Sequence, residues 1–270
     1  MKHRMIALLL ALLLVGAALT PAAGAAGGEG DEALVEALKG FFAQAEGDYD
    51  SVNRSDGGAC SLGLLQWHGP RALELLRFAL NGWPGTANYL TRSLYREIVG
   101  EGTVWSRRTL TEAEARCVSA LLGSADGRAA QDELARRDIL EYLRLCRSWG
   151  MKTDATAAYF AVVVNQFGAG GAKNYLRLIR ETLGVGEDAV FTDLNVLHQA
   201  VRDTRRCGQP WLPVREKCYA YIASLGWALT DRSGSREQPR TERLPERELS
   251  VWRLGAAALA LLRRWMALLS

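Results

Sequence analysis

A stretch rich in glycine and aspartate, residues 46–68, interrupts a chain whose other segments are mostly helical in pattern. Before it, apolar residues recur at helical spacing over residues 31–45, which predicts an amphipathic helix. Inside it, Asp56 precedes Gly57 and Gly58, and this sequence favours a tight hairpin turn because glycine tolerates positive φ. The chain must therefore fold around one short β-hairpin that follows a helix.

Two carboxylates of this region, Glu46 and Asp56, are candidates for acid–base chemistry. Glu46 closes the predicted helix, and Gly47 stands where a left-handed C-cap residue is expected. The negative end of the helix dipole and burial among apolar neighbours both disfavour the charged form of Glu46, so we expect its pKa to be raised. Asp56 on the turn is expected to face back towards Glu46, and two carboxyl groups across a gap can cleave glycosidic bonds. Asp50 and Asp48 compete with Asp56 for the second role.

These residues resemble the lysozyme-like superfamily, whose lytic transglycosylases and goose-type lysozymes carry a catalytic Glu ahead of a Gly-Leu-Met-Gln run. In this chain Glu46 precedes a Gly-Leu-Leu-Gln run that ends at Gln66, and the similarity extends roughly over residues 31–227. The resemblance implies a lysozyme-like α+β fold, predominantly α-helical, with two helical lobes and a short β-hairpin beside the active-site cleft. It also implies that Glu46 is the general acid and that Gln66 binds the sugar at the cleavage point.

A second similarity lies in residues 157–168, which begin Ala-Ala-Tyr and end Asn-Gln-Phe-Gly. This segment resembles the Ala-x-Tyr-Asn-Ala-Gly motif of lytic transglycosylases, whose Asn contacts the sugar, and it implies that role for Asn165. The segment departs from the motif in having Val164 before the Asn and one more residue before the Gly. The same enzymes place a Tyr near the catalytic Glu, and Tyr219 and Tyr221 both fit that position.

Aromatic side chains are expected to line the cleft, because the faces of sugar rings stack on aromatic rings. The candidates for substrate binding are Trp67, Tyr159, Phe167, Tyr175 and Tyr221. Each of these rings could instead belong to the hydrophobic core.

The rest of the chain to residue 229 predicts further helices. Thr111 and Glu114 are spaced as a capping box, Thr192 is a candidate N-cap, and the glycine-rich turn at residues 168–171 is expected to break a helix. The predicted helices cover residues 70–80, 86–99, 117–122, 128–149, 155–164, 173–183, 193–205 and 214–229.

Residues 1–25 have the pattern of a signal peptide: basic residues, an apolar run and a small-residue cleavage site after Ala25. An uncleaved anchor is the alternative, and either would export the catalytic domain, residues 31–230. Residues 231–249 have the composition of a disordered linker. Residues 250–270 carry arginines on one helical face and tryptophans at both ends, which suits an amphipathic helix lying on a membrane surface. A snorkelling tail anchor, or a helix that docks on the domain, would fit as well.

The formal net charge of +3 is too small to indicate a nucleic-acid partner, although a mildly basic protein suits an anionic cell wall. His68 and His198 have no metal-ligand spacing, so we expect neither a metal nor a cofactor. In an exported protein the five cysteines could form two disulfides and leave one free thiol. Cys207 and Cys218 lie close in sequence, and Cys117 and Cys146 fall on neighbouring predicted helices. Five reduced thiols are the alternative.

Together these observations predict an exported glycosidase that cleaves the β-1,4 bond between N-acetylmuramic acid and N-acetylglucosamine in peptidoglycan. Asp56 would activate water; without such a base, the 6-hydroxyl of the sugar would attack and give the 1,6-anhydro product of a lytic transglycosylase. A catalytically silent glycan-binding module and a chitosanase or chitinase are the alternatives. A cell-wall peptidase with Cys60 as nucleophile and His198 or His68 as base is a further one.

Overall fold

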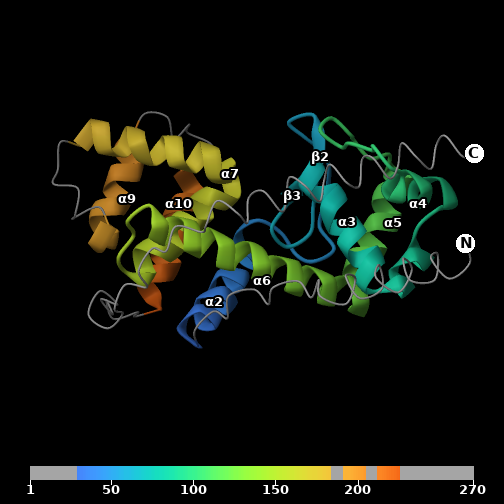
Figure 1. The fold of residues 1–270 in the computed structure, drawn as a ribbon, viewed down its shortest axis with the longest axis horizontal. Helices are drawn as coiled ribbons and strands as arrows, with labels where there is room; N and C mark the ends of the chain where they lie inside the picture. The colour runs from blue at the N-terminus through green and yellow to red at the C-terminus, as the bar shows by residue number, and fades with distance from the viewer. Residues whose placement is uncertain (1–28, 184–190, 205–211, 226–270) are drawn as a thin grey trace, which may run out of the picture. The chain divides into compact units, whose positions relative to one another are not determined.

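The long helix α6 (Ala125–Ser148) links two groups of helices (Figure 1). It packs against α3 (Pro70–Gly82) and α5 (Glu112–Gly123) in one group and against α7 (Asp154–Leu183) in the other. Its inward face is apolar at helical spacing and includes Leu134, Ile139 and Leu143, all of which are buried. The helix predicted over residues 128–149 is thereby confirmed, although it begins three residues earlier.

The structure is a computed structural model that describes residues 29–183, 191–204 and 212–225. They belong to one compact unit, which the chain forms within residues 1–230. The predicted signal peptide, linker and C-terminal helix lie outside the described residues, and they stay predictions. None of the helices in the described ranges is long and apolar enough to cross a membrane.

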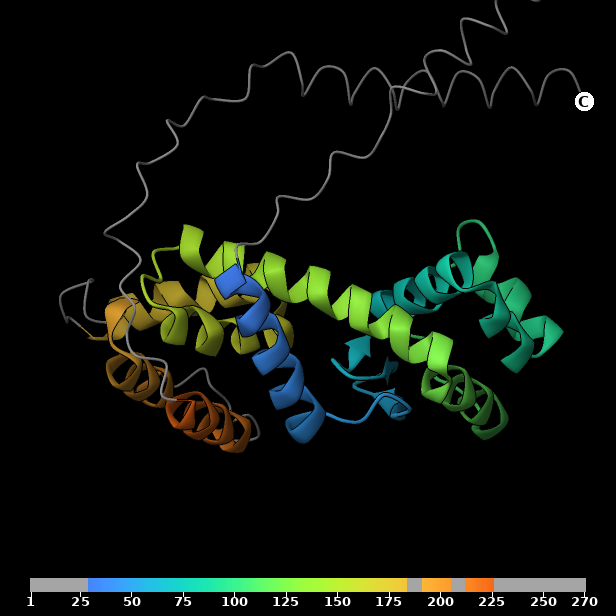
Figure 2. The ribbon, with the colours of Figure 1, turned by 90° about the horizontal axis from the view of Figure 1, so that it is seen from below.

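The first group of helices is completed by a short 3-10 helix, η1 (Pro84–Tyr89), and α4 (Arg92–Val99). The second contains α9 (Leu194–Asp203) and α10 (Leu212–Ser224), which pack on each other and on α7. Helix α2 (Glu29–Ala45) packs on α6, α7 and α10, and its C-terminal end leads into the sheet (Figure 2).

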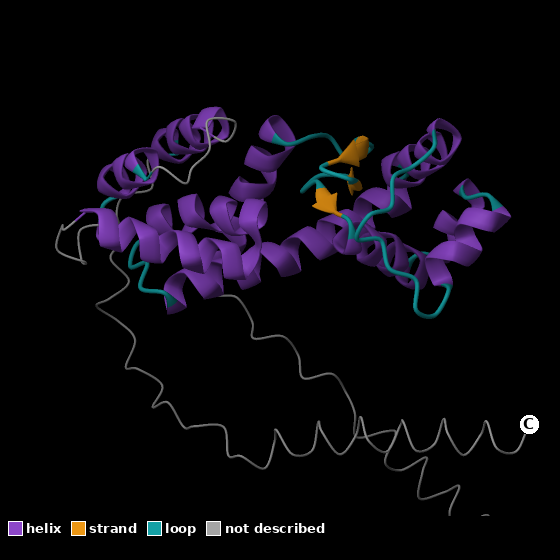
Figure 3. Cartoon of the chain, turned by 90° about the horizontal axis from the view of Figure 1, so that it is seen from above, coloured by secondary structure: helices purple, strands orange, loops and turns teal. Residues whose placement is uncertain are grey.

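Three short antiparallel strands lie between the two helix groups, shown in orange in Figure 3. The strands β1 (Val52–Asp56), β2 (Ala59–Leu62) and β3 (Trp67–His68) pair in the order β1-β2-β3. The turn between β1 and β2 consists of Gly57 and Gly58, with φ of 59° and 103°, a conformation that only glycine adopts without strain. The predicted hairpin is confirmed, but Asp56, predicted to lie on the turn, is the last residue of β1.

The link from β2 to β3 is held by a buried amide from α6. Gly63 and Gln66 both have positive φ there, 65° and 49°. The side chain of Gln131 is fully buried; its Oε1 accepts from the backbone N–H of Leu64 at 3.0 Å, and its Nε2 donates to the carbonyl of Leu122 at 3.0 Å. A Cβ on Gly63 would lie 2.2 Å from this Oε1, so glycine is required by space as well as by φ. Gln131 therefore fixes the sheet to α5 and α6.

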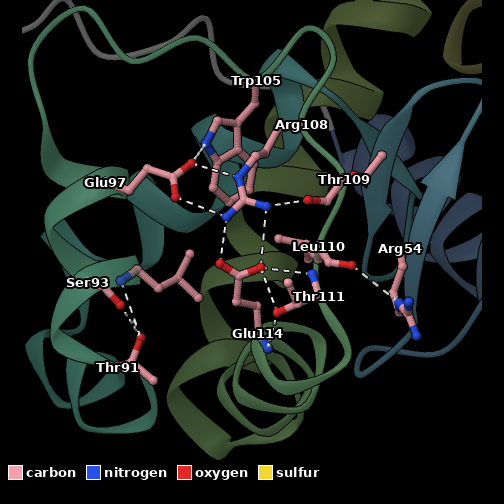
Figure 4. A network of polar contacts seen from close by, with 11 residues as sticks. Arg54, Thr91, Ser93, Glu97, Trp105, Arg108, Thr109, Leu110, Thr111 and Glu114 are labelled. Atoms are coloured by element: carbon pink, nitrogen blue, oxygen red, sulfur yellow. Dashed lines mark hydrogen bonds and ion pairs between the residues drawn. The ribbon is translucent and has the colours of Figure 1, made fainter.

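The loop before α5 is held by Arg108 (Figure 4). Its guanidinium donates to Glu97 at 2.8 Å and to Glu114 at 2.6 Å, and Trp105, which is fully buried, donates to Glu97 at 2.9 Å. Hydrogen bonds from Arg108 lower the pKa of Glu114 to about 2. The same loop bonds to the hairpin, since the N–H of Leu110 donates to the carbonyl of Arg54 at 3.1 Å. The predicted capping box of Thr111 and Glu114 is confirmed.

Two predicted helix boundaries are wrong. The helix predicted over residues 86–99 is divided into η1 and α4, because Thr91 caps α4 by accepting from the N–H of Leu94. Helix α9 is capped by Asp193 rather than Thr192, since its carboxylate accepts from two backbone N–H groups and carries the charge that a helix N-terminus favours. The predicted break in the glycine-rich turn at residues 168–171 is confirmed, because Gly168 leaves the helical conformation (φ 67°, ψ 167°) and divides α7 into two helical segments at a kink.

The four cysteines in the described ranges, Cys60, Cys117, Cys146 and Cys218, all carry free thiols. A bridge between Cys117 and Cys146 is therefore not formed, and the alternative of reduced thiols holds for these four. Cys207 lies outside the described residues.

We expect Gln131→Met to lower the free energy of unfolding by about 2–3 kcal/mol, because it leaves the buried N–H of Leu64 without an acceptor. Urea unfolding followed by circular dichroism measures the change. Gln44→Met on the exposed face of α2 is the matched control and should change stability by less than about 0.5 kcal/mol. Equal effects of the two substitutions would contradict a structural role for the buried amide.

Candidate active site

Glu46 follows the last residue of α2, and its backbone N–H donates to the carbonyl of Phe42 at 2.9 Å. Its side chain lines an open groove of about 620 Å³ between the end of α2 and the hairpin. The other residues that line this groove are Ser51, Val52, Asn53, Arg54, Ser55 and Gln66. The helix thus delivers one carboxyl group to a groove that is otherwise polar and mostly uncharged.

Burial raises the pKa of the Glu46 carboxyl, and the negative charge of Asp56 raises it further. A hydrogen bond from Gln166 and the positive charge of Arg215 act in the opposite direction, but burial is the largest cause and the net shift is upward. Glu46 therefore keeps its proton to a higher pH than an exposed glutamate does. This is the property that a general acid needs.

Gly47 is not in the left-handed conformation, so the prediction of a left-handed C-cap is wrong. A Cβ at this position would lie 2.8 Å from Oγ of Ser51 and 3.1 Å from Nε2 of Gln66. Glycine is thus required because two polar side chains pack directly against the backbone next to Glu46.

Asp56 ends β1 and is exposed. The hydroxyl of Ser61 donates to its Oδ2 at 2.7 Å, and Nε2 of His68 lies 2.8 Å from its backbone carbonyl. Asp50 lies elsewhere, in a separate groove of about 600 Å³ between β1 and α5. Of these two candidates for the second carboxylate, Asp56 is the one whose charge raises the pKa of Glu46.

Gln66 lines the groove, and its Nε2 donates to the carbonyl of Gly63 at 2.9 Å. Asn165 lies on α7 and donates to the carbonyl of Leu65 at 3.3 Å, so it connects α7 to the turn that carries Gln66. Asn165 is not among the residues that line the groove. A sugar-binding role therefore fits the position of Gln66 better than that of Asn165.

Two residues near Glu46 were not predicted from the sequence. Nε2 of Gln166 donates to Oε1 of Glu46 at 3.1 Å. Arg215 on α10 is fully buried, and its guanidinium lies 5.3 Å from the centre of the Phe167 ring. Gln166 directly follows the Asn that the resemblance singles out. Arg215 could have been noticed as a charged residue on the buried stripe of α10, where Cys218 and Ile222 follow at helical spacing.

Three of the predicted substrate-binding rings lie in the core. Tyr159, Tyr175 and Trp67 are 0%, 4% and 3% exposed. The hydroxyl of Tyr159 lies 2.8 Å from Nδ1 of His198, Tyr175 donates to the carbonyl of Val201, and Trp67 donates to Asp138. Because their polar atoms are bonded within the core, the predicted substrate-binding role does not agree with the structure for these three rings.

The two tyrosines of α10 are used in helix packing. Tyr221 donates to the carbonyl of Ala37 on α2 at 3.0 Å, and its ring lies 5.6 Å from that of Phe41. Tyr219 stacks on His198 at 4.2 Å and donates to Asn195 on α9. Among the described residues neither hydroxyl bonds to Glu46, so neither fits the tyrosine that the resemblance places beside the acid.

The described residues do not form the cysteine–histidine pair that a cysteine peptidase needs. Cys60 is fully buried, and burial raises the pKa of its thiol to about 11. His198 is held between Tyr159 and Glu216, while His68 bonds to the Asp56 carbonyl. In the part of the chain that the structure describes, no group of three or more His, Cys, Asp or Glu residues could hold a metal ion.

No protein-family model and no curated protein matches the sequence. Two solved structures match the fold. One is a single-residue mutant of chitosanase from Bacillus subtilis MY002, complexed with 6 GlcN, with a TM-score of 0.51 at 18% sequence identity. The other is the native chitosanase, with a TM-score of 0.50 at 18% identity; each comparison covers 73% of this chain and 88% of the other. Chitosanases have a lysozyme-like α+β fold, so the predicted fold class is confirmed.

We expect Glu46→Gln to stabilise the protein at neutral pH, because an ionised and half-buried carboxylate is replaced by a neutral amide of the same shape. The sign follows from the raised pKa. The unfolded chain loses the Glu46 proton at a lower pH than the folded chain, so wild-type stability falls as pH rises between the two pKa values. The gain in the variant should therefore grow from pH 4 to pH 7.5 in urea unfolding experiments.

Glu36→Gln, on the exposed face of the same helix, is the matched control. It removes a surface ion pair with Lys39 and should cost no more than about 1 kcal/mol. A Glu46→Gln variant that is less stable than wild type at pH 7.5 would show that the charged form of Glu46 is favoured in the folded protein.

Proposed function

We propose that this protein is an exported glycosidase that cleaves the β-1,4 bond between N-acetylmuramic acid and N-acetylglucosamine in peptidoglycan strands. The observation that carries the proposal is Glu46, a half-buried carboxyl of raised pKa that lines an open groove beside the hairpin bearing Asp56. The similarity of the fold to chitosanases supports the broader class, a glycosidase that acts on a glycan polymer.

In the proposed reaction Glu46 donates its proton to the glycosidic oxygen as the bond breaks. Asp56 accepts a proton from a water molecule that attacks the opposite face of the sugar, which inverts the configuration. Because Ser61 occupies Oδ2 of Asp56, Oδ1 is the oxygen left for that water. If Asp56 is not the base, the 6-hydroxyl of the sugar attacks instead, Glu46 acts first as acid and then as base, and the product is a 1,6-anhydro sugar.

The charge of the groove supports an N-acetylated substrate. Among the residues that line the groove, Glu46 is the one acidic residue and Arg54 the one positively charged residue. The other lining side chains are two hydroxyls, two amides and one apolar group, those of Ser51, Ser55, Asn53, Gln66 and Val52. A glucosamine polymer carries an ammonium group on each unit and would be attracted by several carboxylates. Amide and hydroxyl lining suits N-acetyl sugars, and Arg54 could pair with the lactyl carboxylate of N-acetylmuramic acid.

Chitosan is the second candidate substrate, because the two solved structures of similar fold are chitosanases and one is complexed with 6 GlcN. A glycan-binding module without activity is the remaining alternative.

Export and membrane association are further parts of the proposal. The patterns that support them, the signal peptide at residues 1–25 and the amphipathic segment at residues 250–270, lie outside the described residues. An interfacial helix next to the catalytic domain would keep the enzyme close to the layer of cell wall nearest the membrane.

Mass spectrometry of the soluble products from purified peptidoglycan tests the reaction. We expect muropeptides from the wild-type chain and a loss of at least about 100-fold in rate for Glu46→Gln, because the amide has no proton to donate. Reducing ends, together with a comparable loss in Asp56→Asn, identify a hydrolase with Asp56 as base. Anhydro ends, with activity retained in Asp56→Asn, identify a lytic transglycosylase.

The same proteins incubated with chitosan provide the control for specificity. Cleavage of chitosan but not peptidoglycan would assign the enzyme to the second candidate substrate. If wild type and Glu46→Gln bind peptidoglycan equally and neither releases products, the protein is a binding module.

Flotation with vesicles tests the membrane proposal. We expect the chain without residues 1–25 to float with vesicles that contain phosphatidylglycerol, and replacement of Arg253, Arg263 and Arg264 by Gln to weaken binding, at about 1 kcal/mol per charge removed. Equal flotation of the two proteins, or none by either, would rule out an electrostatically assisted interfacial helix.

A further inference from the structure

Two polar side chains near Glu46, those of Gln166 and Arg215, have buried atoms without a hydrogen-bond partner. Gln166 donates from Nε2 to Oε1 of Glu46 at 3.1 Å, but its own Oε1 is buried without a hydrogen-bond partner. Arg215 is 0% exposed, and none of its three guanidinium nitrogens has a partner among the described residues. These side chains come from α7 and α10, which pack on each other and on α2.

An unpaired charge in this position is costly. Burying an ion without hydrogen bonds costs several kcal/mol, and the neighbouring inward positions of α10, Cys218 and Ile222, are apolar. A hydrophobic residue would therefore stabilise the fold better than Arg215 does. The two interactions that offset the cost are the Phe167 ring beneath the guanidinium and the attraction of Glu46.

The unsatisfied atoms of the two side chains are complementary. Arg215 has only donors, and Oε1 of Gln166 is an acceptor. Phe167, whose ring lies under the guanidinium, is the residue next to Gln166, so both groups occupy the same small region. A direct N–H···O bond after a small side-chain rotation, or one bridging water, would satisfy both. Such a bond leaves the NH₂ group of Gln166, and not its oxygen, facing Glu46.

We propose, building on the function proposed above, that Gln166 and Arg215 are positioning residues that fix the Glu46 carboxyl in one orientation. In this arrangement Arg215 donates to Oε1 of Gln166, directly or through a water molecule. Nε2 of Gln166 in turn donates to Oε1 of Glu46. The carbonyl oxygen of a protonated carboxyl is the stronger acceptor, so this bond favours the acidic proton on Oε2. That oxygen has no partner among the described residues, which leaves its proton for the glycosidic oxygen.

The arrangement also serves the second half of the reaction. Once Glu46 has donated its proton, its negative charge remains in a half-buried site. Arg215 is a fixed cation near that charge, and it stabilises the carboxylate without occupying the groove. Protonated and ionised Glu46 can then alternate without movement of the side chain.

Titration of Glu46 by NMR of ¹³C-labelled glutamate, assigned with Glu46→Gln, tests this chain of contacts without any substrate. The charged groups that act on Glu46 are Asp56 on β1 and Arg215 on α10. We expect Gln166→Met and Arg215→Met each to raise the pKa of Glu46, because each removes an interaction that favours the carboxylate. The double variant should shift it by less than the sum, since Arg215 acts partly through Gln166.

Gln44→Met on the exposed face of α2 is the control and should leave the titration unchanged. Asp56→Asn should lower the pKa of Glu46, because it removes a negative charge that raises this pKa. This opposite shift confirms that the titration reports the charges around Glu46. If the Arg215 variant does not fold, the pKa of Glu46 in Gln166→Met alone tests the proposal. A Glu46 pKa that neither substitution moves, or shifts that simply add, overturns the proposal.

In an enzyme with the proposed activity, Gln166→Met should also lower kcat about tenfold with little change in KM, and the alkaline limb of its pH profile should move up with the NMR pKa. A wild-type chain that cleaves no glycan would refute the proposed function, whereas the titration result stands independently of it. A lower kcat with an unshifted pH profile would indicate a merely structural role and overturn the positioning role.

Discussion

The backbone between β2 and β3 depends on one buried amide. Two residues of that turn have positive φ, and its polar groups are turned away from water, so the turn needs a partner inside the protein. Gln131 provides it from the middle of α6, and Gly63 leaves the space that the amide requires. Because α6 also packs on α2, the same helix connects the sheet, whose strand β1 carries Asp56, with the helix that Glu46 follows.

The side chains of the candidate site are positioned by two kinds of structure, packed helices and an exposed hairpin. Helices α7 and α10 supply Gln166 and Arg215, and Glu46 directly follows α2, which packs on both of these helices. The hairpin supplies Asp56 and most of the groove lining from exposed backbone, which is in turn tied to the loop before α5. A rigid acid facing a more exposed partner suits a reaction in which the acid must be held in a dry environment and the other group must reach water.

The sequence predicted the elements that depend on local patterns. Helical periodicity located α2, α3 and α6, and the Asp-Gly-Gly sequence located the hairpin turn. Gln166 and Arg215 could not be found in this way, because Gln166 meets Glu46 across 120 residues of chain and periodicity shows which face is buried but not what that face contacts. The aromatic residues show the same limit. The pattern identifies a ring that could stack on a sugar, whereas burial, which depends on tertiary packing, put Tyr159, Tyr175 and Trp67 in the core.

The distribution of charge distinguishes the role of each cation. Arg54 lines the groove, whereas Arg215 is fully buried and is not among the residues that line the groove. A buried guanidinium without partners lowers stability, and a lysozyme-like fold does not require it, since the neighbouring positions of α10 are filled by apolar side chains. Its position beside Glu46 agrees with the proposed positioning role: burial raises the pKa of Glu46 and disfavours its charged form, and a nearby fixed cation acts in the opposite direction.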